Sequence, residues 1–134
     1  KEDGLSVEYD STGIVLNQGN YIEGYKTGVW KLWVNDHREE GEFVDGERNG
    51  EWLWYMGNGQ KVFEGKFENG LAVEKHRKWH PNGNIMEVGK YEAGERNGKW
   101  QYYNDAGICD LELEYEAGIV VRINGVKIIE SEVD

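Results

Sequence analysis

The chain has 134 residues and a formal net charge of −11, because 26 acidic side chains outnumber 15 basic ones. We expect a single domain at residues 1–134, with no binding to nucleic acid or to anionic membranes, since both need a basic face. The chain contains six Trp, eight Tyr, three Phe and 19 Gly but only one Pro, a composition that favours short strands with tight turns over disorder or long helices.

The sequence shows no targeting segment. No apolar run approaches the roughly 18 residues of a membrane-spanning helix, and no apolar export segment opens the chain. Because the chain begins with Lys1 and not Met, we leave the compartment open between the cytoplasm and export after removal of a signal sequence. The single cysteine, Cys109, excludes an internal disulfide, and we expect it to be a small buried hydrophobic residue.

A repeat of about 24 residues runs through the chain, with units at residues 4–27, 28–49, 50–73, 74–97 and 98–121. The third residue of a unit is usually Trp, and the sixth is always aromatic. The third residues are Ser6, Trp30, Trp52, His76 and Trp100, and the sixth are Tyr9, Trp33, Tyr55, Trp79 and Tyr103. Self-similarity at one period predicts a stack of like structural units.

The second unit is shorter than the others and contains the charged run Asp36-His37-Arg38-Glu39-Glu40. Imidazole and carboxylate groups are metal ligands, which makes this run the best metal candidate in the sequence. The alternative is a solvated charged turn, and Arg38 in the middle of the run favours it. We therefore expect no metal and no cofactor.

The third unit illustrates the β-hairpin that every unit predicts. Residues 51–55 are aromatic-rich strand sequence, Gly57-Asn58-Gly59 is a turn, and residues 62–67 form a second strand. Gly65 and its equivalent Gly89 would weaken a strand by themselves, so their regular return predicts that a neighbouring ring covers each of them. The fold class is then all-β: a single elongated, twisted antiparallel meander of stacked hairpins.

The fourth unit departs from the repeat, with Glu74 and His76 where Gly and Trp are expected. It also concentrates positive charge in an acidic chain. We single out these residues as a candidate partner-binding patch: Lys75, His76, Arg77, Lys78 and Trp79. The alternative is an exposed strand face that resists edge pairing or lies against acidic neighbours.

The end of the chain differs from the repeat. Residues 119–130 read as a hairpin of β-branched residues around the turn Asn124-Gly125. A terminal element of different composition is typical of the cap of a repeat protein.

The repeat resembles the MORN repeat in its bacterial variant, found in YwqK-type antitoxin-like proteins. The resemblance is carried by the aromatic run at residues 50–55, by Asn58-Gly59 and by residues 64–70. It covers residues 4–121 and implies stacked antiparallel hairpins in one elongated sheet. MORN repeats are associated with membrane or phosphoinositide binding, with scaffolding and with appended enzyme domains; the acidity of this chain argues against the lipid role.

The sequence contains no arrangement that points to catalysis. No Gly-x-Ser-x-Gly elbow is present, and carboxylate pairs are uninformative among 26 acidic residues. We therefore expect a non-enzymatic module for protein–protein interaction or scaffolding through an aromatic-rich sheet surface. Two alternatives stay open: an antitoxin or immunity-like inhibitor of a basic toxin, and a positioning domain of a larger protein. The identity of the partner and the oligomeric state are left open.

Overall fold

The computed structural model describes residues 4–9, 15–34 and 36–127. Asn35 of the shortened unit and residues 128–130 of the terminal hairpin lie outside the described residues. The described residues form β-strands joined by turns, with these bounds: β1 Gly4–Tyr9, β2 Val15–Ile22, β3 Tyr25–Val34, β4 His37–Val44, β5 Glu47–Met56, β6 Lys61–Glu68, β7 Leu71–Trp79, β8 Ile85–Glu92, β9 Glu95–Tyr103, β10 Cys109–Glu116, β11 Ile119–Ile123 and β12 Val126–Lys127.

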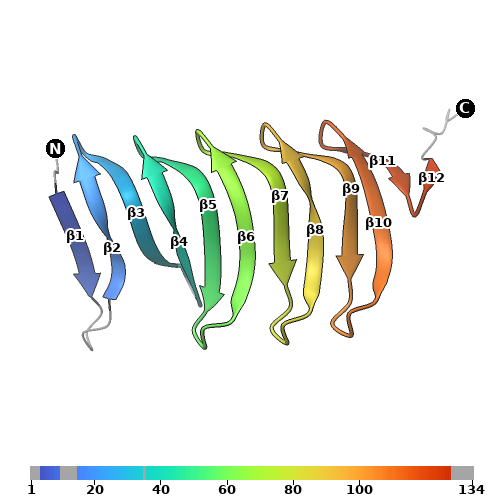
Figure 1. Ribbon diagram of the computed structural model, residues 1–134, viewed down its shortest axis with the longest axis horizontal. Coiled ribbons are helices and arrows are strands. Elements are labelled where there is room, and N and C mark those ends of the chain that lie inside the picture. The colour runs from blue at the N-terminus through green and yellow to red at the C-terminus, as the bar shows by residue number, and fades with distance from the viewer. Residues whose placement is uncertain (1–3, 10–14, 35, 128–134) are drawn as a thin grey trace, which may run out of the picture.

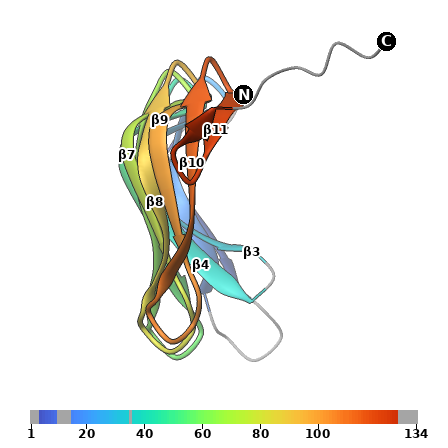
Figure 2. The same ribbon diagram turned by 90° about the vertical axis from the view of Figure 1, so that its right-hand side faces the viewer.

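The strands form one 12-stranded antiparallel sheet in which each strand pairs with its neighbours in the sequence. The order runs from β1 to β12 without a crossover, so these two strands form the opposite edges of the sheet (Figure 1). At about 4.8 Å per strand the sheet is roughly 50 Å long. The expected all-β meander of stacked hairpins is therefore confirmed. Seen from its end, the sheet is bowed and not flat (Figure 2).

Two-residue turns join each hairpin to the next, and they lie together at the top of the view in Figure 1. In each of them both central residues have positive φ, as in Asn69 (49°) and Gly70 (81°). This geometry belongs to the type I′ turn, whose twist matches that of the paired strands. Each turn is also bonded to the strand that follows the preceding turn, as where the amide N–H of Gly70 donates to the carbonyl oxygen of Arg48 in β5 at 2.9 Å. Neighbouring hairpins are thereby held in a fixed stagger.

Three tryptophans, Trp30, Trp52 and Trp100, are the most deeply buried side chains among the described residues, at 2% exposure or less. With His76 they occupy equivalent positions on one side of the sheet, which we call the core face. Each ring lies over a glycine of the preceding strand, so that a Cβ there would overlap it; the covered glycines are Gly19, Gly41, Gly65 and Gly89. The predicted covering of Gly65 and Gly89 is thus confirmed.

The same glycines shape the sheet. At each of them the pairing with the following strand shifts register, as between Glu64 and Lys66, and such a bulge bends the strand. The ring nitrogen of the covering residue donates to the carbonyl of the residue after the glycine. Trp52 Nε1 bonds Glu42 at 3.1 Å, and Trp100 Nε1 bonds Lys90 at 3.0 Å. A single-layer sheet therefore buries its tryptophans without a second layer, by laying each ring over a glycine of the preceding strand.

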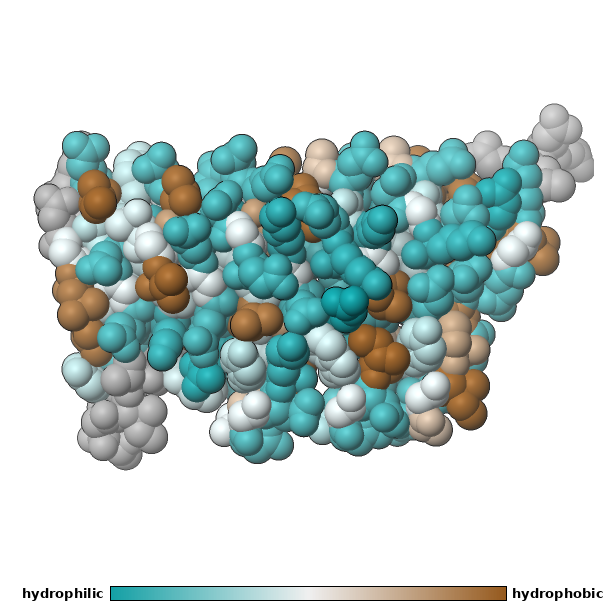
Figure 3. Space-filling model, viewed as in Figure 1, coloured by the Kyte–Doolittle hydropathy of each residue, from teal (hydrophilic) through white to brown (hydrophobic). Residues whose placement is uncertain are grey.

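The second aromatic of each repeat lies on the other side of the sheet. Because side chains alternate between faces along a strand, a spacing of three residues places Trp33 opposite Trp30. We call this side the second face and define it by Trp33, Tyr55, Trp79 and Tyr103, all of which are partly exposed. The surface view is mostly hydrophilic, with scattered hydrophobic groups (Figure 3).

Two features near the C-terminal end bear on the sequence predictions. Cys109 is exposed, so the expectation of a buried residue was wrong. It is the first residue of β10, directly after a turn, where little packs over a side chain. The described part of the terminal hairpin pairs Arg122 with Lys127 and Ile123 with Val126 around Asn124-Gly125, as the sequence indicated.

Candidate functional site

Strand β7 breaks the repeat at four neighbouring positions. The segments that lead to Trp52 and Trp100 share the pattern Glu-Arg-Asn-Gly, whereas the segment that leads to His76 reads Leu71-Ala72-Val73-Glu74. Glu74 keeps the positive φ (56°) of the glycine that it replaces. The backbone conformation of the repeat is therefore retained at β7, and the irregular unit differs from the others in its side chains.

On the core face the change removes an ion pair. The guanidinium of Arg48 lies 4.8 Å from the ring centroid of Trp52 and bonds the carboxylate of Glu39, which is 4% exposed. Arg96 similarly covers Trp100 at 4.9 Å and approaches Glu87 at 3.8 Å. At the positions that precede His76 in the same way, the chain has Ala72 in place of the arginine and Phe63 in place of the glutamate. Both charges are lost together, which avoids leaving one of them buried and unpaired.

His76 takes the place of a tryptophan in an aromatic environment. It is 4% exposed, and the centroids of three rings, Phe63, Phe67 and Tyr91, lie 5.4, 5.4 and 4.5 Å from its own. Its Nε2–H donates to the carbonyl oxygen of Lys66 at 2.9 Å. Burial lowers the pKa of His76 below its usual value. A neutral, enclosed imidazole is not available to a partner at the surface.

The burial of His76 predicts a pH-dependent stability. Because the pKa of His76 is lowered in the folded chain, the unfolded chain binds this proton first as the pH falls through about 6.5. We expect the free energy of unfolding to decrease below that pH, until the folded-state pKa is reached. In His76→Trp, which restores the ring of the other units, this contribution should be absent. Urea unfolding of both proteins between pH 7.5 and 5 measures the difference.

His37 and His80 are present in both proteins of that comparison, so their contributions cancel in the difference. Carboxylates such as Glu64, whose pKa is lowered by its hydrogen bond to Lys61, act in a more acidic range. Parallel stability profiles for the parent and His76→Trp across this pH range would contradict the neutral, buried state of His76.

The structure separates the other members of the predicted patch. Arg77 bonds Glu64 at 2.7 Å, and Lys78 lies 3.3 Å from Glu87. Alternation along β7 places Lys78 with His76 on the core face and leaves three members on the second face: Lys75, Arg77 and Trp79. The five residues are therefore divided between two surfaces, and whether those on the second face contact a partner stays a prediction.

On the second face two cations lie against aromatic residues of the repeat. Arg38 lies 5.9 Å from the ring centroid of Trp33 and 5.0 Å from that of Tyr55. Lys61 lies 5.0 Å from the centroid of Trp79. We call the four rings of the second face, Trp33, Tyr55, Trp79 and Tyr103, the ring row. The repeat pattern contained these rings, but only the strand alternation assigns them to a face.

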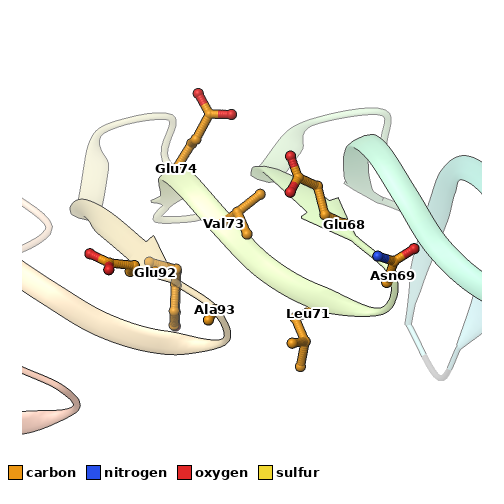
Figure 4. A pocket seen from close by; sticks show the side chains of 8 residues that line it. Glu68, Asn69, Leu71, Val73, Glu74, Glu92 and Ala93 are labelled. Atoms are coloured by element: carbon orange, nitrogen blue, oxygen red, sulfur yellow. The ribbon is translucent and has the colours of Figure 1, made fainter.

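The irregular unit also borders a pocket of about 440 Å³ between the turn ends of β6, β7 and β8. Figure 4 shows side chains from all three strands around it. Its lining combines carboxylates with apolar groups: Glu68, Glu74 and Glu92 with Leu71, Val73, Tyr91 and Ala93, besides Asn69. Glu74 is bonded to Lys66 at 2.9 Å, so part of this negative charge is already compensated within the chain.

The charged run of the second unit is engaged in contacts within the protein. His37 Nε2 donates to Glu39 Oε2 at 3.0 Å, and the His37 ring stacks on Trp54 at 5.0 Å. Arg38 pairs with Glu40 at 2.7 Å. Across the described ranges, no group of three or more His, Cys, Asp and Glu residues is placed to hold a metal ion. The same ranges include no helix of the length and apolarity that a membrane span needs.

Comparisons with known proteins add little to this site. No family model matches the chain, and no curated protein matches it. Among solved structures it is similar to part of an S. aureus TarM mutant in complex with Fondaparinux, alpha-GlcNAc-glycerol and UDP, with a TM-score of 0.45 and 13% identity. The match covers 83% of this chain but only 21% of that one, and at this level of similarity it carries no functional argument.

Proposed function

We propose that the chain is a non-enzymatic module that binds a protein partner on the second face of its sheet. The observation that supports this is the ring row, because its four aromatic side chains lie partly exposed on the side away from the buried tryptophans. Tryptophan and tyrosine are enriched at protein interfaces, where a small number of such residues contributes most of the binding energy.

The repeat architecture supports an extended contact. Equivalent rings recur every second strand, which places them about 10 Å apart along the sheet. Repeat proteins use stacked units of this kind to present long binding surfaces. The resemblance to MORN repeats, some of which act in scaffolding, agrees with this role. An elongated partner segment crossing the strands would contact several rings in succession.

The test compares two ring-row variants with a matched aromatic variant elsewhere. Tyr55→Ala and Trp79→Ala remove partly exposed rings of the second face, whereas Tyr25→Ala removes a ring that is 58% exposed beside a turn. Partners are captured with the parent chain from native cells, identified by mass spectrometry, purified and titrated. We expect each ring-row variant to weaken binding by about 30-fold, which corresponds to a hot-spot truncation of about 2 kcal/mol.

Circular dichroism and melting curves for every variant separate a loss of binding from a loss of fold. Equal binding by the parent, Tyr55→Ala and Trp79→Ala would contradict the proposal. So would a loss in Tyr25→Ala as large as that in the ring-row variants, because the contact would then lie at the turns.

A further inference from the structure

A groove on the second face is bordered by three lysines from three adjacent strands. It has a volume of about 400 Å³, and Lys75 of β7, Lys90 of β8 and Lys99 of β9 line it. All three lysines are exposed. Asn97 and Gln101 also line the groove, and their side-chain amides donate to Glu92 at 3.3 Å and to Glu112 at 2.8 Å. We call it the lysine groove.

The lysines of this groove lack the carboxylate partners that neighbouring cations have. Lys66, Arg77 and Lys78 each pair with a glutamate, but no salt bridge within the described ranges involves Lys75, Lys90 or Lys99. Lys75 and Lys90 are directly opposite each other in the strand register. Like charges in such a pair destabilise a sheet, so an anion between them would relieve a repulsion that the fold leaves in place.

The groove also lies in a basic part of an acidic chain. Residues 73–103 contain six basic and four acidic side chains, a net charge of +2. The remaining residues contain nine basic and 22 acidic side chains, a net charge of −13. The excess of positive charge therefore belongs to the segment that contains β7, β8 and β9, whose outer two strands are about 10 Å apart.

We propose that the lysine groove binds a short run of carboxylates in an acidic segment of the partner protein. This inference rests on the proposed function and adds the chemistry of the partner to it. A long polyanion such as nucleic acid, or an anionic membrane, would extend beyond the lysine groove and meet the repulsion of the acidic remainder of the chain. A few consecutive Glu or Asp residues fit over the three lysines of the groove and avoid this repulsion.

The position of the groove also sets the spacing of the partner's contacts. Lys75 and Trp79 lie on the same face of β7, four residues apart, which is roughly 13 Å along a strand. A partner segment with carboxylates over the lysine groove and an apolar residue about 13 Å away would reach the ring row at the same time. Contacts with the lysine groove would fix the position of the partner segment along the sheet, and the ring row would provide its apolar contact.

The test uses a synthetic probe, because the natural segment is unidentified. The probe is a fluorescein-labelled peptide of consecutive glutamates followed by a short spacer and a leucine, and its control has glutamines in place of the glutamates. In fluorescence anisotropy we expect the glutamate peptide to bind at least about tenfold more tightly than the glutamine peptide, with a difference that shrinks as salt is added.

Two chain variants make the test specific to the groove. Lys90→Glu should weaken binding of the glutamate peptide by about tenfold or more, because it reverses a charge inside the groove. Lys31→Glu makes the same change at another exposed lysine of the same face, on β3, and should alter binding less than about twofold. Lys90→Glu also places opposite charges at the pair with Lys75, so it is not expected to impair folding.

Several outcomes would overturn the inference. They are absence of binding by the glutamate peptide, equal weakening by Lys90→Glu and Lys31→Glu, and a preference of the same lysines for a single-stranded oligonucleotide or for phosphatidylserine vesicles. If Trp79→Ala loses the native partner while Lys90→Glu keeps it, the groove inference fails and the proposed function stands. If the peptide binds through Lys90 but the native partner binds Tyr55→Ala and Trp79→Ala as tightly as the parent, the proposed function fails instead.

Discussion

Trp52→Ala is expected to lower the free energy of unfolding by about 3–5 kcal/mol, the usual cost of truncating a large ring in a core. The Trp52 side chain has 0% exposure, covers Gly41 and makes a T-shaped contact with Phe43, whose ring centroid is 5.0 Å away. Its removal also uncovers Arg48, which stacks on the indole. Because the sheet is a single layer, no second layer can close over the resulting gap. Urea unfolding measures the loss.

The matched control for this prediction is Trp33→Ala. Trp33 is also a tryptophan, but it lies on the second face and is partly exposed. Its truncation should therefore lower the free energy of unfolding by only about 1–2 kcal/mol. Trp52→Phe keeps a ring at the site and should fold if Trp52→Ala does not. Similar losses for Trp52→Ala and Trp33→Ala would mean that the two faces contribute equally to stability and would contradict a core confined to the face of Trp52.

Gly89→Val is expected to destabilise the chain by about 3 kcal/mol, at the upper end of the usual cost of overpacking. A Cβ at Gly89 would overlap the indole of Trp100, and that indole is fixed by its hydrogen bond to Lys90 and by the guanidinium of Arg96. The ring cannot move aside without losing both contacts. Thermal or urea unfolding against the parent measures the effect.

Gly57→Val provides the control, because nothing lies within 4 Å of a Cβ placed at Gly57. We expect this variant to unfold within about 0.5 kcal/mol of the parent, as is usual for surface changes. Gly65→Val should lower the free energy of unfolding by more than Gly57→Val and less than Gly89→Val, since the ring over Gly65 is the smaller imidazole of His76. Indistinguishable melts for Gly57→Val and Gly89→Val would contradict the packing of rings on glycines.

The candidate site was only partly predictable. The irregular unit stood out in the sequence through His76 and Glu74, because a departure is visible once a repeat is known. Its residues read as one basic patch in sequence order, but strand alternation divides them between two faces and hides His76. The lysine groove was missed for the opposite reason. Its members, Lys75, Lys90 and Lys99, are far apart in the sequence, and only the pairing of β7, β8 and β9 brings them together.

The sequence by itself determined the hairpins, their order and the covering of glycines by rings, because these depend on local patterns that recur at one spacing. Turn glycines set where each strand ends, and the aromatic positions recur at a constant distance from them. Only the tertiary structure decided which face each ring occupies, which cations are paired and which stay unpaired. Those properties depend on the register between strands and on the bulges at Gly19, Gly41, Gly65 and Gly89, and a shift of one residue would move a side chain to the other face.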